Sequence, residues 1–167
     1  MTTEERERLF LDISDGHKAL IAKVCYLYSS ASASFDDLYQ EVLINLWNGL
    51  DSYRGDARVS TWLYRLAINT CISWHRRNDR HGDNLSLDDI TAEPADDPDS
   101  RNVAEDVKYL HSLISRLDPL EKAVVTLWLD EKPYDEIALI TGISRANVAV
   151  KLHRIKEKLS HFAHGTR

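Results

Sequence analysis

Apolar residues in this chain recur every three or four positions, the spacing that gathers them on one face of an α-helix. No Asn-Gly or Asp-Gly pair joins two runs of alternating apolar and polar residues, the pattern that indicates a β-hairpin. A first helical pattern covers residues 4–28, with a potential break near Gly16. A second helix is predicted to run to about Leu50, capped by Ser34 or Asp36. The sequence therefore predicts an all-α fold.

The loop at residues 52–60 precedes a third predicted helix, which Ser60 or Thr61 can cap and which ends near Arg77. The periodicity then stops across residues 78–102, a stretch rich in aspartate that contains two prolines. Few apolar residues and many like charges cannot offset the entropy lost on ordering, so this stretch is predicted to be a flexible acidic linker. Two small helical domains are expected on either side of it, at residues 1–77 and 103–167.

Helical periodicity resumes at Val103, and Asp118 followed by Pro119 is expected to start another helix, because proline is tolerated in a first turn. Two shorter helices are predicted around residues 134–141 and 145–162. These helices would form the second domain.

The net charge of −6 is distributed unevenly along the chain. Residues 51–82 carry six basic and three acidic side chains, and residues 141–167 carry six basic and one acidic. Between them, residues 83–107 carry one basic and nine acidic side chains. Because phosphate contacts respond to local charge, two basic segments are compatible with DNA binding despite the negative total.

Several classes of protein are disfavoured by what the sequence lacks. Cys25 and Cys71 are too few for a disulfide framework or a four-cysteine metal site, so free thiols in a reducing cytoplasm are expected. No signal peptide or bilayer-spanning stretch is evident, which predicts a cytoplasmic protein without membrane insertion. No glycine-rich phosphate loop or nucleophile motif indicates an enzyme. His161 and His164 lie one helical turn apart, but a frayed polar terminus explains them more simply than a metal site. No cofactor and no metal are expected.

The sharpest local pattern is YDEIALITGISRANVAVKLHR at positions 134–154, which is typical of a helix-turn-helix. Ala138 is small where two helices would cross, and Gly142 sits where the turn needs a left-handed backbone. Ile143 would fill the corner, and Ser144 can cap the second helix.

The second helix of this motif has an apolar stripe that fixes which side chains point outward. The predicted stripe consists of Val148, Leu152, Ile155 and Leu159. At about 100° per residue, Ala146, Val150 and His153 lie opposite the stripe and can enter a major groove. Side chains expected to contact bases or phosphates on this helix are Arg145, Asn147, Val150, Lys151, His153, Arg154 and Lys156. A plain helical hairpin with a solvated basic face is the alternative for this segment.

The predicted helix at residues 35–50 has two unlike faces. Leu38, Val42, Leu43, Leu46 and Leu50 form a broad apolar side. The other side carries Asp37, Gln40, Glu41, Ile44 and Asn48, an acidic face with one exposed isoleucine that can dock a protein or simply be solvated.

Aromatic and basic residues interleave across positions 53–77, through YRGD, STWLYRLAIN and WHRR. Such a mixture suits unstacked bases, because rings offer stacking platforms and arginines hold the backbone. Core tryptophans with surface arginines would give the same pattern, and the residues alone leave both readings open.

Taken together, these motifs resemble those of bacterial RNA polymerase sigma factors of the sigma-70 family. DDLYQEV at 36–42 followed by LW at 46–47 is similar to the core-binding segment of sigma factors, and residues 53–69 are similar to the promoter-melting segment. LDPLEK at 117–122 with the helix-turn-helix is similar to the domain that reads the upstream promoter element. The short two-domain layout resembles the extracytoplasmic function (ECF) group.

The resemblance implies a factor that binds core RNA polymerase, directs it to promoters and helps open the DNA. It implies core-polymerase contacts at Asp37, Gln40, Glu41 and Asn48. It implies minus-ten DNA contacts at Tyr53, Arg54, Asp56, Arg58, Ser60, Asn69, Trp74, Arg76 and Arg77, with the loop and Asn69 capturing a flipped base. The helix-turn-helix residues given above would bind the minus-thirty-five element.

One departure from the family concerns Ala149 and Val150, where members often carry arginine, so the preferred promoter sequence stays open. An anti-sigma factor is an expected partner, since factors of this group are typically held by one. A stand-alone helix-turn-helix regulator is the alternative function. That alternative leaves the aromatic and basic segment at 53–77 unexplained.

Overall fold

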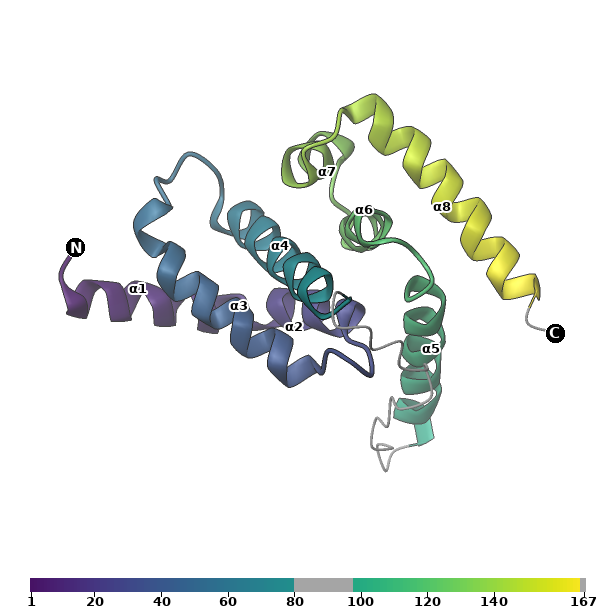
Figure 1. The fold of residues 1–167 in the computed structure, drawn as a ribbon, viewed down its shortest axis with the longest axis horizontal. Helices are drawn as coiled ribbons and strands as arrows, with labels where there is room; N and C mark the ends of the chain where they lie inside the picture. The colour runs from purple at the N-terminus through teal and green to yellow at the C-terminus, as the bar shows by residue number, and fades with distance from the viewer. Residues whose placement is uncertain (80–97, 166–167) are drawn as a thin grey trace. The chain divides into compact units, whose positions relative to one another are not determined.

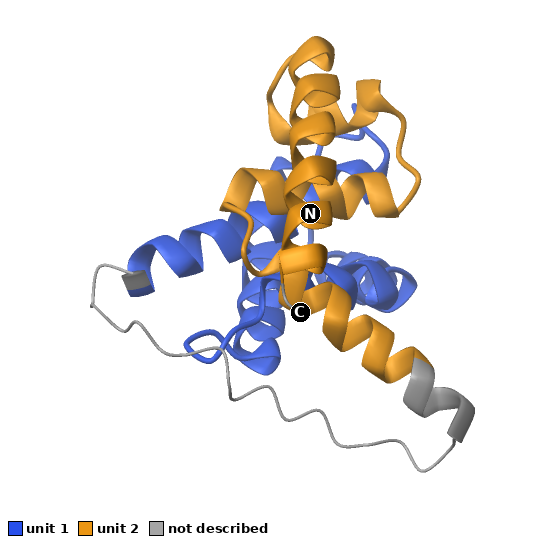
Figure 2. Ribbon diagram, turned by 90° about the vertical axis from the view of Figure 1, so that its right-hand side faces the viewer, with its two compact units in different colours: residues 1–85 blue, residues 86–167 orange. Residues whose placement is uncertain are grey.

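The computed structural model describes residues 1–79 and 98–165, with Asp79 and residues 98–102 described by their backbone alone. Within these ranges the regular structure is helical, and the one extended pairing is an isolated bridge between Ser30 and Ala33. The all-α prediction is therefore confirmed. The chain divides into two compact units, residues 1–85 and 86–167 (Figure 2). Most of the predicted linker at 78–102 lies outside the described residues.

Unit 1 is built from α1 (Thr3–Gly16), α2 (Lys18–Tyr28), α3 (Phe35–Gly49), the short 3-10 helix η1 (Leu50–Ser52) and α4 (Val59–Asp79) (Figure 1). Helices α2, α3 and α4 pack against one another around a single apolar core. Fully buried side chains in it include Ile21, Tyr28, Leu38, Leu46, Leu63 and Tyr64. Burial of this apolar surface is the main force that holds the three helices together.

The break between α1 and α2 falls at His17, next to the predicted position at Gly16. His17 has φ −129° and ψ 28°, outside helical geometry. At its other end α1 is held by a capping box, in which Thr2 and Glu5 bond each other's backbone N–H. The hydrogen bond from the Thr2 N–H lowers the pKa of the Glu5 carboxyl.

The two predicted helix caps in unit 1 have different outcomes. Ser34 caps α3, since its Oγ accepts a hydrogen bond from the Asp37 N–H at 3.1 Å. The prediction that Ser60 or Thr61 caps α4 was wrong. The helix begins at Val59, and the Arg58 carbonyl accepts a hydrogen bond from the Trp62 N–H. Ser60 and Thr61 therefore lie inside the first turn. Helix α4 also continues to Asp79, two residues beyond the predicted end.

Unit 2 consists of α5 (Pro98–Ile114), α6 (Pro119–Leu129), α7 (Tyr134–Thr141) and α8 (Arg145–Gly165). Helix α5 begins at Pro98, five residues before the predicted Val103. A proline at the first helical position loses no backbone hydrogen bond, because that N–H has no partner inside the helix. The start of α6 after Asp118 is confirmed, and Asp118 forms a capping box with Glu121.

Helix α6 lies at the centre of unit 2 and packs on both α7 and α8. Its buried residues include Val124 and Leu127, and Ile137 of α7 and Leu152 of α8 are buried in the same unit. Glu121 is almost fully buried and accepts a 2.7 Å hydrogen bond from the Lys158 ammonium of α8. This bond fixes the far half of α8 to the N-terminal end of α6. Among the described helices, none combines the length and the hydropathy needed to cross a membrane.

Candidate nucleic-acid interfaces

The turn between α7 and α8 has the geometry of a helix-turn-helix. Gly142 adopts φ 80° and ψ 8°, the left-handed conformation predicted for it, and its N–H bonds the Ala138 carbonyl at 2.9 Å. Ser144 caps α8, because its Oγ accepts a hydrogen bond from the Asn147 N–H at 3.1 Å. The conformation predicted for Gly142 and the cap predicted at Ser144 are both confirmed.

The outward face of α8 is the predicted one. Val148, Leu152 and Ile155 are buried, and Leu159 at the end of the stripe is partly covered. On the opposite side Ala146, Asn147, His153 and Arg154 are exposed, and Val150 keeps 48% of its surface accessible. An exposed valine flanked by polar and basic side chains suits contact with a thymine methyl group in a major groove.

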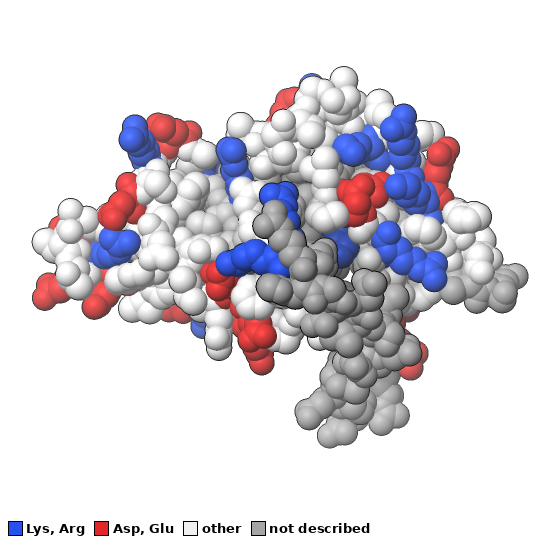
Figure 3. Space-filling view, in the orientation of Figure 1, with Lys and Arg blue, Asp and Glu red and all other residues white. Residues whose placement is uncertain are grey.

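Several predicted DNA contacts on α8 already have partners within unit 2. Arg145 pairs with Asp135 at 3.4 Å, and His153 lies 3.2 Å from Glu157. The Lys156 ammonium stands 4.6 Å from the centre of the Trp128 ring. Exposed ion pairs contribute about 0–1 kcal/mol, so a phosphate can replace these acidic partners at little cost. In Figure 3 basic side chains, with acidic ones among them, gather over the part of the molecule that α8 occupies.

The acidic face of α3 also lies outward, as predicted. Asp37, Gln40 and Asn48 are exposed, and 53% of the Ile44 surface is accessible. Glu41 is half-buried, and its Oε1 lies 3.4 Å from Nη2 of Arg77 on α4.

The loop between η1 and α4 is shaped around Tyr53. The Tyr53 hydroxyl donates a 3.0 Å hydrogen bond to the Ala57 carbonyl, and its ring lies 5.0 Å from that of Trp62. Gly55 adopts φ 78°, which lets the chain turn back over this ring. The charged side chains Arg54, Asp56 and Arg58 are exposed around the turn, whereas Tyr53 and Ser60 are half-buried.

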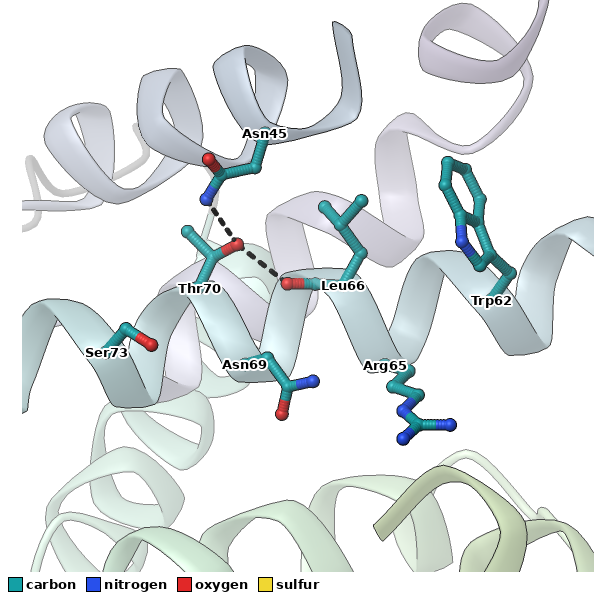
Figure 4. Close-up of a pocket in the computed structure, with 7 residues that line it drawn as sticks. All are labelled: Asn45, Trp62, Arg65, Leu66, Asn69, Thr70 and Ser73. Carbon is teal, nitrogen blue, oxygen red and sulfur yellow. Dashed lines mark hydrogen bonds between the residues drawn. The ribbon is translucent and has the colours of Figure 1, made fainter. Parts of the chain in front are cut away.

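A cavity of about 440 Å³ opens on one face of α4 (Figure 4), and Trp62, whose ring packs on Tyr53 of the loop, lines it. Trp62, Arg65, Asn69 and Ser73 line it at positions that share one side of the helix. Asn69, which the sequence analysis predicted as a site residue, is exposed there, and its side-chain amide can both donate and accept hydrogen bonds. Arg65 and Asn69 extend from neighbouring turns toward the same side.

The wall of the cavity that faces α3 is held by side-chain hydrogen bonds. The Asn45 amide donates to Thr70 Oγ1 at 2.9 Å, and the Thr70 hydroxyl donates to the Leu66 carbonyl at 2.7 Å. Sequence reasoning missed Trp62, Arg65 and Ser73 as lining residues. Helical spacing of four and seven positions from Asn69 was the signal that would have found them.

The basic end of α4 is only partly available as a stacking surface. The Trp74 ring is half-buried, and its Nε1 is buried without a hydrogen-bond acceptor among the described residues. The Arg77 guanidinium lies 5.8 Å from the centre of this ring, within the range of a cation–π contact. Arg76 and Arg77 are both exposed, so this end offers positive charge rather than a free aromatic face.

A helix-turn-helix in one unit and an aromatic, basic surface in the other define a helical DNA-binding protein. Comparison with protein families specifies the class. Residues 14–81 match the model of sigma-70 region 2, and residues 108–159 match that of sigma-70 region 4.

The chain belongs to the sigma-70 family, and it is an ECF sigma factor, a DNA-binding factor of transcription initiation that works with core RNA polymerase.

Curated relatives agree with this assignment. The RNA polymerase sigma factor YlaC of Bacillus subtilis is 31% identical over 74% of this chain and 73% of its own. The ECF RNA polymerase sigma-E factor of Escherichia coli K12 is 29% identical over 83% of this chain and 80% of its own.

Two solved structures share the fold. CnrH in complex with the cytosolic domain of CnrY gives a TM-score of 0.68 at 18% identity and covers 96% of this chain and 91% of its own. The sigma factor RpoE in complex with the anti-sigma factor NepR, from Bartonella quintana, gives 0.70 at 20% identity and covers 99% of this chain and all of its own.

Proposed function

We propose that this sigma factor divides its work among three surfaces. The exposed face of α3, with Asp37, Gln40, Glu41 and Asn48, docks on core RNA polymerase. The loop at 53–60 and the cavity around Asn69 capture a base of the minus-ten element. The outward face of α8 binds the minus-thirty-five element.

The observation that carries the minus-ten assignment is the placement of Asn69. Its amide stands exposed in a cavity whose wall is tied to α3 through Thr70, so the site is formed before any base arrives. A preformed pocket lowers the cost of binding, because fewer groups have to be ordered. Extruding a base costs a few kcal/mol, which contacts in such a pocket have to offset. Arg65 supplies a cation on the same face for the strand that carries the base.

The minus-thirty-five assignment rests on different chemistry. Helix α8 is a rigid element with an exposed apolar residue, Val150, between polar ones that can reach base edges. Lys151 and Arg154 lie on the same helix and can meet phosphates on either side of the groove. This surface can therefore read duplex DNA, whereas the cavity requires an open strand.

The match to sigma-70 region 2 removes the alternative of a stand-alone helix-turn-helix regulator.

The remaining parts of the proposal are a cytoplasmic location, the absence of catalytic activity and control by an anti-sigma factor. The structures of RpoE with NepR and of CnrH with CnrY support an anti-sigma partner, since each relative is bound by another protein.

The proposal is tested by separating strand opening from duplex binding. Holoenzyme made from the full chain first selects a promoter from a randomised library. On that promoter, Asn69→Ala is expected to reduce permanganate reactivity of the minus-ten element while leaving upstream duplex binding intact.

The reciprocal control is Arg154→Ala, which is expected to weaken the closed complex by about 1–3 kcal/mol if this arginine contacts a base. Normal strand opening by the Asn69→Ala holoenzyme on a fully paired template contradicts the minus-ten assignment.

A further inference from the structure

Arg6 lies in α1, ahead of the residues matched by the region 2 model, which begin at residue 14. Its guanidinium nevertheless contacts the part of unit 1 that leads into the minus-ten loop. Nη1 donates a 2.6 Å hydrogen bond to Asp51 Oδ2 in η1, and Nη2 donates a 2.7 Å bond to the Trp47 carbonyl near the end of α3. One side chain thus joins α1 to both α3 and η1.

The environment of Arg6 favours a fixed position. The guanidinium lies 4.9 Å from the centre of the Trp47 ring, and Phe10 of α1 meets the same ring edge-on at 5.5 Å. The Arg6 side chain is 24% exposed, so its contacts are only partly screened by water. A cation is also favourable at the C-terminal end of α3, because the last carbonyls of a helix carry partial negative charge. One charge-assisted hydrogen bond and a ring contact hold the C-terminal end of α3, and the second hydrogen bond holds η1.

A chain of contacts leads from this anchor to the loop. A Cβ added at Gly49, the last residue of α3, would lie 3.5 Å from Trp62 and from Leu66, so the end of α3 packs closely on α4. Beyond η1, the Tyr53 N–H bonds the Leu50 carbonyl at 3.3 Å, and the Tyr53 ring packs on Trp62.

The loop itself is closed by the bond from the Tyr53 hydroxyl to the Ala57 carbonyl. The position of η1 therefore determines where the loop stands beside the cavity.

We propose that Arg6 is a positioning residue for the minus-ten loop. It fixes the end of α3 and η1, so that residues 53–58 stand beside the Asn69 cavity before a base is captured. Arg6 acts through these elements and does not contact DNA. The inference rests on the proposed role of the cavity and adds a control element from outside the region matched by the family model.

The test uses holoenzyme assembled from core RNA polymerase and the full chain. Two affinities are measured, one for a single-stranded oligonucleotide with the non-template minus-ten sequence and one for upstream duplex DNA. Arg6→Ala is expected to weaken the single-strand affinity about tenfold, the factor that corresponds to about 1.4 kcal/mol, and to leave duplex affinity unchanged. Arg6→Lys, which keeps the charge toward Asp51 but loses the forked geometry, is expected to recover part of the loss.

The matched control is Arg8→Ala, which removes an exposed arginine from the same helix and is expected to change neither affinity. Equal losses on both DNAs with Arg6→Ala would mean that it merely destabilises the chain, and unchanged single-strand affinity would mean that the loop does not depend on it. Either result overturns the inference.

If Arg6→Ala does not fold by circular dichroism, Asp51→Asn takes its place, because Asp51 is 61% exposed and only the ionic half of the contact is lost. A selective loss of single-strand affinity is then required. Asn69→Ala separates this inference from the proposed function. If Asn69→Ala weakens single-strand binding and the Arg6 and Asp51 variants do not, the cavity assignment survives and the role of Arg6 is wrong.

Discussion

Glu41 on α3 and Arg77 near the end of α4 form an ion pair of 3.4 Å between Oε1 and Nη2. It joins the face proposed to dock on polymerase to the basic end of α4 proposed to support promoter DNA. The Arg77 side chain is 60% exposed, so water screens the pair and it contributes little to stability. A polymerase group that engages Glu41 would therefore free Arg77 for a phosphate at small cost.

Charge reversal on α3 tests the docking face. Asp37→Arg with Glu41→Arg is expected to abolish association with core polymerase in a pull-down, because it reverses the charge of an acidic surface. The helical circular dichroism should stay unchanged, since Asp37 is exposed and Glu41 only half-buried.

Arg77→Ala is the control for this double variant, because it breaks the same ion pair and leaves the acidic face in place. It should retain core binding. Full association of the charge-reversed chain would rule out the docking assignment.

The turn of the helix-turn-helix depends on one glycine. Gly142→Ala is expected to destabilise unit 2 by about 1–2 kcal/mol, because φ 80° crowds a Cβ against the following carbonyl. No neighbouring atom lies within 4 Å of the added Cβ, so the cost comes from the backbone alone. Urea unfolding followed by circular dichroism measures it. Gly16→Ala, with equally open space and no positive φ, should be neutral or slightly stabilising.

Glu121 is expected to contribute more to unit 2 than its partner Lys158. Glu121→Ala removes the capping-box bond to the Asp118 N–H as well as the contact with Lys158, for a loss of about 1–2 kcal/mol. Lys158→Met should cost less, because the lysine side chain is 50% exposed and the Glu121 carboxylate keeps its hydrogen bond from the Asp118 N–H. Hydrogen exchange of the α6 amides in the full chain compares the two. A larger effect for Lys158→Met would show that the ion pair contributes more to the stability of unit 2 than the cap does.

Helical periodicity and turn chemistry were enough to predict most of the fold. Ser34, Asp118 and Ser144 each cap the helix that was expected, because a short side chain with an oxygen can bond a free backbone N–H of the first helical turn. The start of α4 was predicted too late in the sequence, because Arg58 has no capping side chain that would mark it. Burial of Thr61 and Leu63 stabilises the first turn instead. Tertiary burial overrode the local signal there.

The exposed site residues were predictable, whereas the contacts between distant segments were not. Asn69 and Val150 follow from periodicity, because burial of one helix face exposes the other. The Arg6 contact with Asp51 spans 45 positions and depends on how α1 turns back at His17. No local pattern encodes that angle.

The outward face of α8 predicts two kinds of DNA contact with different signatures. Val150 is expected to read a thymine methyl, so replacing one thymine of the minus-thirty-five element by deoxyuridine should weaken binding of the wild-type holoenzyme. Lys151 is expected to meet a phosphate. Lys151→Gln should therefore weaken binding to all sequences alike and reduce the slope of log affinity against log salt concentration by about 1.

A double-mutant cycle distinguishes these roles, because Val150→Ala removes the partner of the methyl group. If the valine and the methyl touch, deoxyuridine costs the wild type binding energy and costs the Val150→Ala variant nothing further. The salt slope of Val150→Ala should equal that of wild type, since no charge is lost. Lys151→Gln should keep the full sensitivity to deoxyuridine at every thymine tested. A methyl effect that persists in Val150→Ala at each position would place another residue of α8 against the base, and exposed Ala146 and Ala149 would be the next to test.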